Sequence, residues 1–504
     1  MSLQPSRGRI AAVVLNSVFH DSRVIKEAES LAAAGWDITI FGIQDRRNNQ
    51  PRGHTPGGVP VVLCSWEPAY LLLQQRLLHA LLPLWLIASL VVSVALWHGL
   101  RLLVQLFSMQ GLLAVGLFGL LAILGLRGWA ASSSRIARRL QFASDAAGAE
   151  QELLSVPGRH LLNVYTEIAP MLHLRFYKKH YDYAVKVLDR ALRIWSMRNE
   201  LTRAIVAFAP DVVHCHDAGT LPVGLAVRQR SVRRVRLVYD SHEFATEIKG
   251  MDRIGRVVTR WRENQAMGQL DALITVNESI AAELGRRYPA YPPALVVCNA
   301  TRPLPVVPSD DGRLRRAAGL APSQRILLYQ GGFSGHRGLT QAIQAAMLLP
   351  PDWSLVMMGW GGLQPVLEKL ARNLDPAGER IRFVPPAPQA ELSYWTAGAA
   401  LGIIPYENVC LNHWYCSPNK LWEYPAAGVP VLVSPFPVLR ERVERYGIGW
   451  FLDDPVTPEG IARVVAGLDD DSLAGVRAAC ERFIAADNWS LYEARLVGMY
   501  DRLL

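Results

Sequence analysis

The sequence predicts an α/β protein built from two doubly wound domains, the first of which carries an apolar insertion. Short β-branched runs alternate with helical stretches along most of the chain, as in parallel βαβ units. A proline-rich stretch at Arg302–Pro308 separates two such sets and is typical of an interdomain linker. At 504 residues the chain is also too long for a single core. We therefore expect two or three domains.

The first set occupies residues 1–304 and is interrupted by residues 66–190. The helices expected there are Ser22–Ala34, Ala191–Phe208, one that ends near Leu270, and Ser279–Arg287. The expected strands are Arg9–Leu15, Asp37–Gly42, Val59–Cys64, Val212–Cys215, Arg236–Tyr239, Ala272–Val276 and Ala294–Cys298. Their order predicts one mostly parallel sheet covered by helices.

The second set occupies residues 305–484, and residues 485–504 are expected to form a helix that packs back on the first domain. Its expected strands are Ile326–Tyr329, Ser354–Met358, Ile381–Val384, Ala400–Ile404 and Val429–Val433, with helices between them. Open α/β sheets bind ligands at the carboxyl ends of their strands. Two such domains facing one another predict a cleft between those two edges.

Two apolar stretches inside the insertion predict a membrane hairpin. Leu77–Trp97 and Leu102–Leu126 contain no Asp, Glu, Lys or Arg, and each approximates the ~20 residues of a membrane-spanning helix. Arginines flank the outer ends, at Arg76 and from Arg127 onward, which places both ends in the cytosol. A re-entrant hairpin that does not cross, and a pair of helices buried in a soluble core, are the alternatives.

The charge balance suits a phosphorylated substrate, an anionic lipid surface or nucleic acid, because the formal net charge is +9. Basic and aromatic residues interleave over Leu161–Trp195, as in a headgroup-zone helix or in an ordinary solvated helix face. No nucleic-acid recognition module is present in the sequence, so lipid or a small anion is favoured. The six scattered cysteines predict reduced thiols in the cytosol, and Ile10–Leu15 is too short for a signal peptide.

A helix start near residue 420 predicts a binding site for a sugar nucleotide. Lys420 and Glu423 lie three apart and project from one face of the first turns of this helix, where backbone amides attract anions. A second phosphate-binding segment is the glycine-rich stretch Gly331–Gly338, in which Arg337 can neutralise phosphate oxygens. A cation, a carboxylate and free amides suit a ligand with phosphates and hydroxyls, although a flexible loop and a surface carboxylate are the simpler interpretations.

Polar residues also follow the strands of the first set. His216 and Asp217 end one strand, and His242 and Glu243 follow the next, so both pairs are expected in one cleft wall. His214 lies deeper on the same side and is interpreted as structural. Asn16 to Arg23 forms the loop after the first strand, with Asp21 or Ser22 as the helix cap. Arg23 could hold a phosphate of an acceptor, and a plain capped helix is the alternative.

Taken in order, these motifs resemble those of glycosyltransferase family 4, whose members have the GT-B fold of two facing Rossmann-like domains. The resemblance covers both sets but not the hairpin insertion. The segments that carry it are His20–Val24, Val213–Asp217, Val238–Glu243, Tyr329–Gly332 with His336–Gly338, and Pro418–Glu423.

The resemblance implies which residues bind the donor, a nucleotide-diphosphate sugar. Its diphosphate would lie on Gly331, Gly332 and Arg337, with Asn419 and Lys420 at the helix start, and its ribose hydroxyls on Glu423. The family's first glutamate, eight positions before Glu423, is replaced by Tyr415, so Asn412, His413 or Tyr415 would have to take its place. The segments Gly359–Gly362 and Phe383–Pro386 resemble the walls around the nucleotide base.

The same resemblance implies that His216 lies close to the reacting anomeric carbon. Asp217 and Glu243 are the further catalytic candidates, and Asn16, Arg23 and His242 are candidates for binding the acceptor. A buried hydrogen-bonding role is the alternative for His242 and Glu243. The implied enzyme is a retaining hexosyltransferase that needs no metal and no cofactor, at the cytosolic face of the inner membrane. Its acceptor would be lipid-linked, such as a polyprenyl diphosphate in envelope polysaccharide or glycan assembly. The alternatives are a sugar-nucleotide epimerase or hydrolase and a non-catalytic membrane scaffold.

Overall fold

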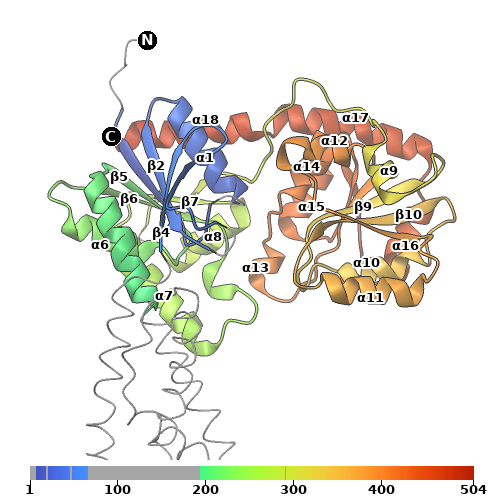
Figure 1. Ribbon diagram of the computed structural model, residues 1–504, viewed down its shortest axis with the longest axis horizontal. Coiled ribbons are helices and arrows are strands. Elements are labelled where there is room, and N and C mark those ends of the chain that lie inside the picture. Colours follow the sequence, from blue (N-terminus) through green and yellow to red (C-terminus); the bar gives the residue numbers. More distant parts are fainter. Residues whose placement is uncertain (1–6, 19–20, 46–47, 66–192, 290) are drawn as a thin grey trace, which may run out of the picture. The chain divides into compact units, whose positions relative to one another are not determined.

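The computed structural model describes residues 7–18, 21–45, 48–65, 193–289 and 291–504, which form two sheets with their helices (Figure 1). The predicted hairpin at Leu77–Trp97 and Leu102–Leu126, and most of the basic stretch before Trp195, lie outside these residues. Among the helices that are described, none combines the length and the apolar character needed to span a bilayer.

The N-terminal domain contains an eight-stranded sheet in the order β3-β4-β2-β1-β5-β6-β7-β8. All neighbours pair in parallel except the edge strand β3, which runs antiparallel to β4. The strands are β1 (Arg9–Val13), β2 (Asp37–Ile43), β3 (Arg52–His54), β4 (Pro60–Cys64), β5 (Val212–His216), β6 (Arg236–Ser241), β7 (Ala272–Thr275) and β8 (Leu295–Val296). The seven predicted strands are present, and β3 is an addition that alternation of buried residues did not indicate.

The C-terminal domain contains a six-stranded parallel sheet in the order β11-β10-β9-β12-β13-β14. The strands are β9 (Arg325–Gly332), β10 (Trp353–Trp360), β11 (Ile381–Val384), β12 (Leu401–Ile404), β13 (Val431–Val433) and β14 (Gly449–Phe451). The predicted loop at Gly331–Gly332 is instead the end of β9, where Gly331 pairs with Gly359. A β-carbon on Gly359 would overlap the Gly331 carbonyl, so the two backbones meet more closely than side chains would allow.

Helices cover both faces of each sheet (Figure 1). In the N-terminal domain they are α1 (Ser22–Ala33), residues 193–208, α6 (Leu221–Arg230), the short η2 (Ala245–Glu247), α7 (Arg253–Met267) and α8 (Glu278–Arg287). In the C-terminal domain they are α9 (Arg313–Ala318), α10 (Leu339–Ala346), α11 (Gln364–Leu374), η3 (Gln389–Glu391), α12 (Leu392–Thr396), α13 (Leu411–Trp414), α14 (Lys420–Ala426), α15 (Pro437–Tyr446), α16 (Pro458–Ala466) and α17 (Asp470–Ala486).

The last helix, α18 (Trp489–Leu503), packs on the N-terminal domain. Its Trp489 indole donates a hydrogen bond to Ser30 Oγ of α1 at 2.9 Å. The Tyr500 hydroxyl lies 2.8 Å from His214 Nδ1 of β5, and its ring contacts Trp36 edge-on. The side chains of α18 therefore complete the core of the N-terminal domain beside α1 and β5.

Candidate active site

Two cations meet at the carboxyl end of the six-stranded sheet. The Arg337 guanidinium lies over the Tyr406 ring at 4.2 Å from its centroid, and the Lys420 ammonium donates to the Tyr406 hydroxyl at 3.2 Å. Lys420 also lies 5.0 Å from the centroid of the Tyr329 ring. Burial works against its charge, but the oxygens of Tyr329 and Tyr406 outweigh that effect and raise the pKa of Lys420. Both side chains thus remain positively charged at neutral pH.

Gly331 brings the strand end up to this ammonium. It has a positive φ of 118°, and a β-carbon there would lie 3.0 Å from Lys420 Nζ. A side chain at this position would therefore strain the backbone and crowd the cation. The residue type at the end of β9 keeps the space next to Lys420 open.

Glu423 is held one helical turn from Lys420. Its carboxylate accepts a hydrogen bond from Gln330 Nε2 at 2.9 Å, and Gln330 Oε1 accepts one from the Thr396 hydroxyl at 2.8 Å. The Gln330 backbone N–H donates to the Tyr424 hydroxyl at 3.0 Å. Gln330 therefore orients the carboxylate, and it was not among the predicted site residues although it lies within the motif Tyr329–Gly332.

Asn419 has a different role from the one expected at a helix start. It stands at the N-cap position of α14, but its side chain makes no capping bond there. Instead its amide donates to Ser22 Oγ of α1 at 3.2 Å. Asn419 thus contacts the N-terminal domain, and its predicted contact with the donor stays a prediction.

Asp240, at the end of β6, is the centre of a buried ionic cluster in the N-terminal domain. Its two carboxylate oxygens accept hydrogen bonds from Arg23 Nη2 at 3.0 Å and from Arg23 Nε at 2.9 Å. His242 Nε2 lies 3.0 Å from the same carboxylate. Burial opposes ionisation, but Arg23 and His242 hold the pKa of Asp240 well below its usual value. Asp240 was not among the predicted site residues.

The prediction that Arg23 holds an acceptor phosphate is not supported by its placement. The side chain is buried, and each of its nitrogens faces a protein group. Besides Asp240, it contacts Glu27 at 2.9 Å, the Val297 carbonyl and the Asn299 side chain. The predicted cap of the same helix is confirmed, since Asp21 accepts from the Val24 N–H at 3.2 Å. Arg23 is a structural cation that holds α1 to the sheet.

The two histidines of the cleft wall contact one another. His242 Nε2 lies 3.0 Å from His216 Nδ1, and burial lowers the pKa of His216, which is therefore neutral at pH 7. Burial disfavours charge on His242 as well, but Asp240 and Asp217 outweigh it and raise the pKa of His242 to about 9. The single proton on His242 Nε2 faces both the Asp240 carboxylate and His216 Nδ1, each at 3.0 Å, so the three side chains form one hydrogen-bonded group.

The expected pairing of His216 with Asp217 is replaced by a pairing with His242. Asp217 has a left-handed backbone, with φ of 65°, and its carboxylate lies 3.8 Å from His242 Nδ1 rather than against His216. His214 stacks on His216 with ring centroids 4.1 Å apart, which agrees with its structural interpretation. Glu243 lies in the loop after His242, and its side chain is exposed. Partial loss of hydration and the nearby charge of Asp217 raise the pKa of Glu243, and the charge of Arg337 partly offsets this rise.

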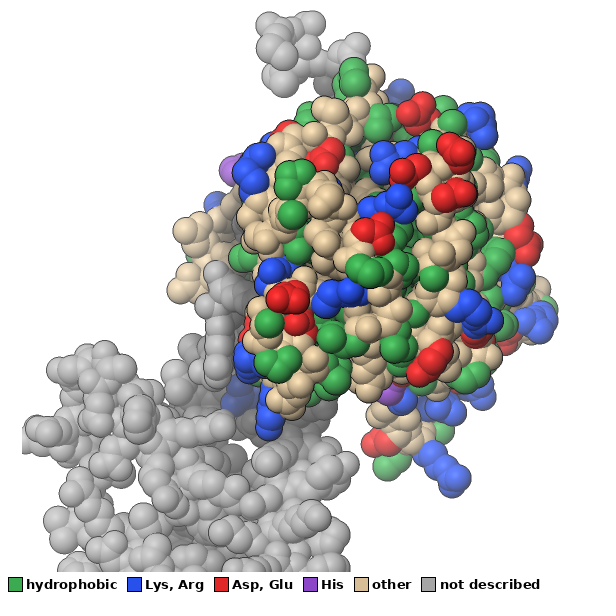
Figure 2. Space-filling model, turned by 90° about the vertical axis from the view of Figure 1, so that its right-hand side faces the viewer, with side chains coloured by type: hydrophobic (Ala, Val, Ile, Leu, Met, Phe, Trp, Pro, Cys, Tyr) green, Lys and Arg blue, Asp and Glu red, His purple; other side chains and the backbone are tan. Residues whose placement is uncertain are grey.

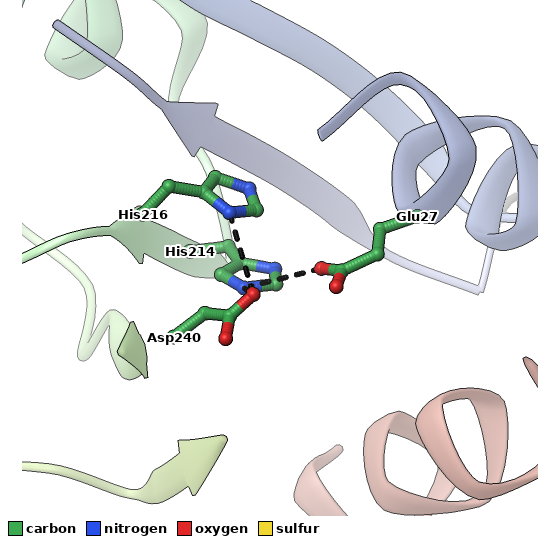
Figure 3. A group of neighbouring side chains, drawn as sticks. All are labelled: Glu27, His214, His216 and Asp240. Atoms are coloured by element: carbon green, nitrogen blue, oxygen red, sulfur yellow. Dashed lines mark ion pairs between the residues drawn. The ribbon is translucent and has the colours of Figure 1, made fainter. Parts of the chain in front are cut away.

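Glu27, His214, His216 and Asp240 form a compact group of potential metal ligands (Figure 3). The four ligand atoms lie within 4.8 Å of one another, and all four residues are buried. However, the Arg23 guanidinium already contacts both carboxylates of the group. A divalent ion would have to bind beside that guanidinium and the protonated His242, and both would repel it. The negative charge of the two carboxylates is therefore better neutralised by Arg23 and His242 than by a metal ion.

The remaining predicted residues hold loops together. The Asn16 side chain donates to Asp21 Oδ2 at 2.9 Å and accepts from the Val18 N–H at 2.8 Å, so it shapes the loop before α1. Near the missing first glutamate, Asn412 Oδ1 accepts from the Phe244 N–H at 2.8 Å, and the Tyr415 carbonyl accepts from Asn277 at 2.8 Å. Both contacts join the two domains.

Comparisons with known proteins agree with this architecture. Residues 160–301 match the model described as Glycosyltransferase Family 4, and residues 310–485 match the one described as Glycosyl transferases group 1. The chain is 29% identical to a D-inositol 3-phosphate glycosyltransferase from Thermobispora bispora, over 58% of this chain and 71% of the relative. A second such enzyme, from Catenulispora acidiphila, is 27% identical over 58% of this chain and 72% of the relative.

Solved structures show the same fold. Sucrose-phosphate synthase from Thermosynechococcus elongatus superposes with a TM-score of 0.61 at 14% identity, covering 99% of each chain. HepE from Anabaena, solved with UDP and glucose, gives a TM-score of 0.50 at 15% identity, covering 60% of this chain and 81% of its own. With both halves matched by transferase family models, the chain is a glycosyltransferase, and its two parallel sheets have the GT-B fold.

Proposed function

We propose that this enzyme moves a sugar, with retention of anomeric configuration, from a nucleotide-diphosphate sugar to a lipid-linked acceptor. The acceptor class is a polyprenyl diphosphate that carries a growing envelope polysaccharide or glycan. The observation that carries the donor assignment is the convergence of Arg337, Lys420 and Glu423 at the carboxyl end of one sheet.

The chemistry of this end of the sheet suits departure of a nucleotide diphosphate. The largest charge developed during transfer is on that leaving group, and Arg337 and Lys420 would stabilise it without a metal ion or other cofactor. Glu423, fixed by Gln330, would accept hydrogen bonds from ribose hydroxyls. The Anabaena structure with UDP and glucose supports a uridine nucleotide as the first donor to test.

The buried cluster would serve the sugar side of the reaction. His216 would form a hydrogen bond with a hydroxyl of the donor sugar, and Asp217 and Glu243 would face the acceptor. Front-side attack with retention needs no strong base, since the departing diphosphate can take the proton of the attacking hydroxyl.

The lipid-linked acceptor is supported by the two apolar stretches of the sequence, Leu77–Trp97 and Leu102–Leu126. These would place the enzyme at the inner membrane with both domains in the cytosol. A phosphorylated cyclitol is the second candidate acceptor, because the curated relatives are named D-inositol 3-phosphate glycosyltransferases. Both acceptors carry phosphate, but only one is anchored in a bilayer.

A substrate screen separates these candidates. The full chain is incubated with a panel of nucleotide sugars and with polyprenyl-diphosphate sugars in vesicles, D-inositol 3-phosphate, or no acceptor, and products are read by mass spectrometry. Transfer to the vesicle acceptor is expected. Transfer only to inositol phosphate would favour the second candidate, and conversion of the nucleotide sugar without an acceptor would favour an epimerase or hydrolase.

Two variants test the donor site. Arg337→Ala and Glu423→Ala are each expected to lower kcat/KM more than tenfold, because each removes a contact that strengthens in the transition state. Arg372→Ala, which truncates an exposed arginine of α11 in the same domain, is the matched control. Turnover like that of the wild type in both site variants would reject the site assignment.

A further inference from the structure

Helix α7 exposes a row of large apolar side chains. Ile254 is 75% exposed, Val257 67% and Trp261 59%, and Val258 lies beside them. A surface helix of a globular domain normally turns such residues toward the core. Their exposure together on one helix therefore indicates that this face is meant for another environment.

The spacing places these four residues on one side of the helix. Positions 254, 257, 258 and 261 follow the i, i+3, i+4, i+7 pattern, which covers about 100° of the circumference. The opposite side is anchored by Glu263, whose buried carboxylate accepts hydrogen bonds from Tyr239 and Tyr288 at 3.1 and 3.0 Å. These bonds fix the rotation of α7, so the apolar row points away from the sheet.

The exposed charged side chains of α7 are all positive. Arg253, Arg256 and Arg260 are exposed, and Arg262 is partly exposed. Glu263 is the one carboxylate within the helix, and it is buried. The C-terminal domain differs: on the face in Figure 2, Lys and Arg side chains are interspersed with Asp and Glu. Helix geometry places Arg253 and Arg260 on one side of the apolar row and Arg262 on the other, while Arg256 lies nearer the opposite face. The exposed Asp252 caps the start of α7, and the helix itself has no exposed carboxylate.

The helix also lies close in the chain to the cleft wall. It begins ten residues after Glu243, and the short η2 between them contacts both α7 and α13. A surface that binds α7 would therefore lie near the loop that carries His242 and Glu243. An acceptor delivered along that surface would have a short path to the site.

We propose that α7 is an interfacial helix that docks on an anionic lipid bilayer. The apolar row would enter the boundary between headgroups and acyl chains, and the flanking arginines would bind lipid phosphates. Trp261 suits the same depth, since tryptophan concentrates at membrane interfaces. A second copy of this face is a poorer occupant, because a symmetric contact would bring like-charged arginines together. Docking does not require a lipid-linked acceptor, so this proposal and the proposed function fail separately.

Photo-cross-linking tests which surface covers α7. Val257 is replaced by a photoreactive phenylalanine in the full chain, reconstituted in nanodiscs of phosphatidylcholine with phosphatidylglycerol. The matched control carries the same probe at Val232, a fully exposed valine of the same domain. Lipid adducts at position 257 are expected to exceed those at 232 by about tenfold or more, because only α7 would reach the headgroups. Adducts to residues 66–192, adducts to a second copy, or equal lipid adducts at both positions would overturn the proposal.

The arginines are tested on the same probe. The triple variant R253Q/R256Q/R260Q is expected to lower the lipid-adduct yield at position 257 about fivefold or more, as the attraction to anionic headgroups is lost. With the three arginines left in place, replacing phosphatidylglycerol by phosphatidylcholine should lower the lipid-adduct yield at position 257 by a similar factor. All three side chains are exposed, so the fold should tolerate the changes, and an unchanged melting midpoint verifies this. Unchanged adduct yields in both tests would show that anionic lipid is not the partner.

Discussion

The buried pair of Arg23 and Asp240 gives the sharpest stability prediction. Asp240→Asn keeps the size of the side chain but removes the charge that faces the Arg23 guanidinium across two hydrogen bonds of 2.9 and 3.0 Å. Both residues are buried, so the remaining arginine would be left without its main counter-ion. Breaking one partner of such a pair costs about 3 to 5 kcal/mol. The amide still accepts one hydrogen bond, so the lower end of that range is expected.

The assay is the melting midpoint of the full chain, followed by tryptophan fluorescence at pH 7. A loss of about 3 kcal/mol corresponds to a fall of roughly 6 to 12 °C for a domain of this size. The variants Arg23→Gln and R23Q/D240N complete a double-mutant cycle. Because the double variant also removes the Arg23 charge that Asp240→Asn leaves without its partner, it should melt at or above the Asp240→Asn midpoint. A midpoint within about 2 °C of wild type for Asp240→Asn, or simple addition in the cycle, would refute the reasoning.

Three further predictions concern the two clusters. The pKa of His242 rises to about 9 in the folded chain, so its stabilising charge is present in full below pH 6.5 and is lost as the pH rises through 9. His242→Gln should flatten the fall of the melting midpoint between pH 6.5 and 9, and an unchanged slope would contradict this assignment. Gly338→Ala should lower the midpoint by several degrees, since its φ is 64° and a β-carbon would overlap the Pro405 carbonyl; Gly335→Ala, with open space around it, is the control. Tyr406→Phe removes the hydroxyl that Lys420 contacts at 3.2 Å and should change kcat/KM several-fold through the donor's KM; equal donor KM in both proteins would exclude that role.

Much of the fold could be predicted from the sequence because most of its strands are continuous runs of apolar or β-branched residues. The runs Val212–His216 and Arg325–Gly332 are apolar or β-branched over most of their length, and burial on both faces makes that pattern visible. The short strands β3 and β14 were not predicted. The strand β14, Gly449–Phe451, is stabilised by its pairing with β13, and its three residues are too few to show a strand pattern in the sequence. Such edges depend on tertiary contacts that local propensity does not encode.

The C-terminal site was more predictable than the N-terminal one. Arg337, Lys420 and Glu423 project from the ends of elements that the sequence placed correctly, so their approach follows from the topology. The contact of Arg23 with Asp240 was not predicted because the two residues are far apart in the chain. Asp240 lies 217 residues from Arg23, and an arginine in a first helical turn looks equally suited to a phosphate or to a buried carboxylate. Only the three-dimensional contact distinguishes them.

The position of Tyr500 has a consequence for how the enzyme is made. Its hydroxyl meets His214, which the ribosome adds 286 residues earlier. At about 5 to 20 residues per second, roughly 15 to 60 seconds of synthesis pass before that histidine finds its partner. During this interval the core of the nascent N-terminal domain is unfinished next to His214 and His216. The N-terminal domain can therefore complete this part of its core only after α18 has been synthesised, and α18 follows every strand of the C-terminal sheet in the chain.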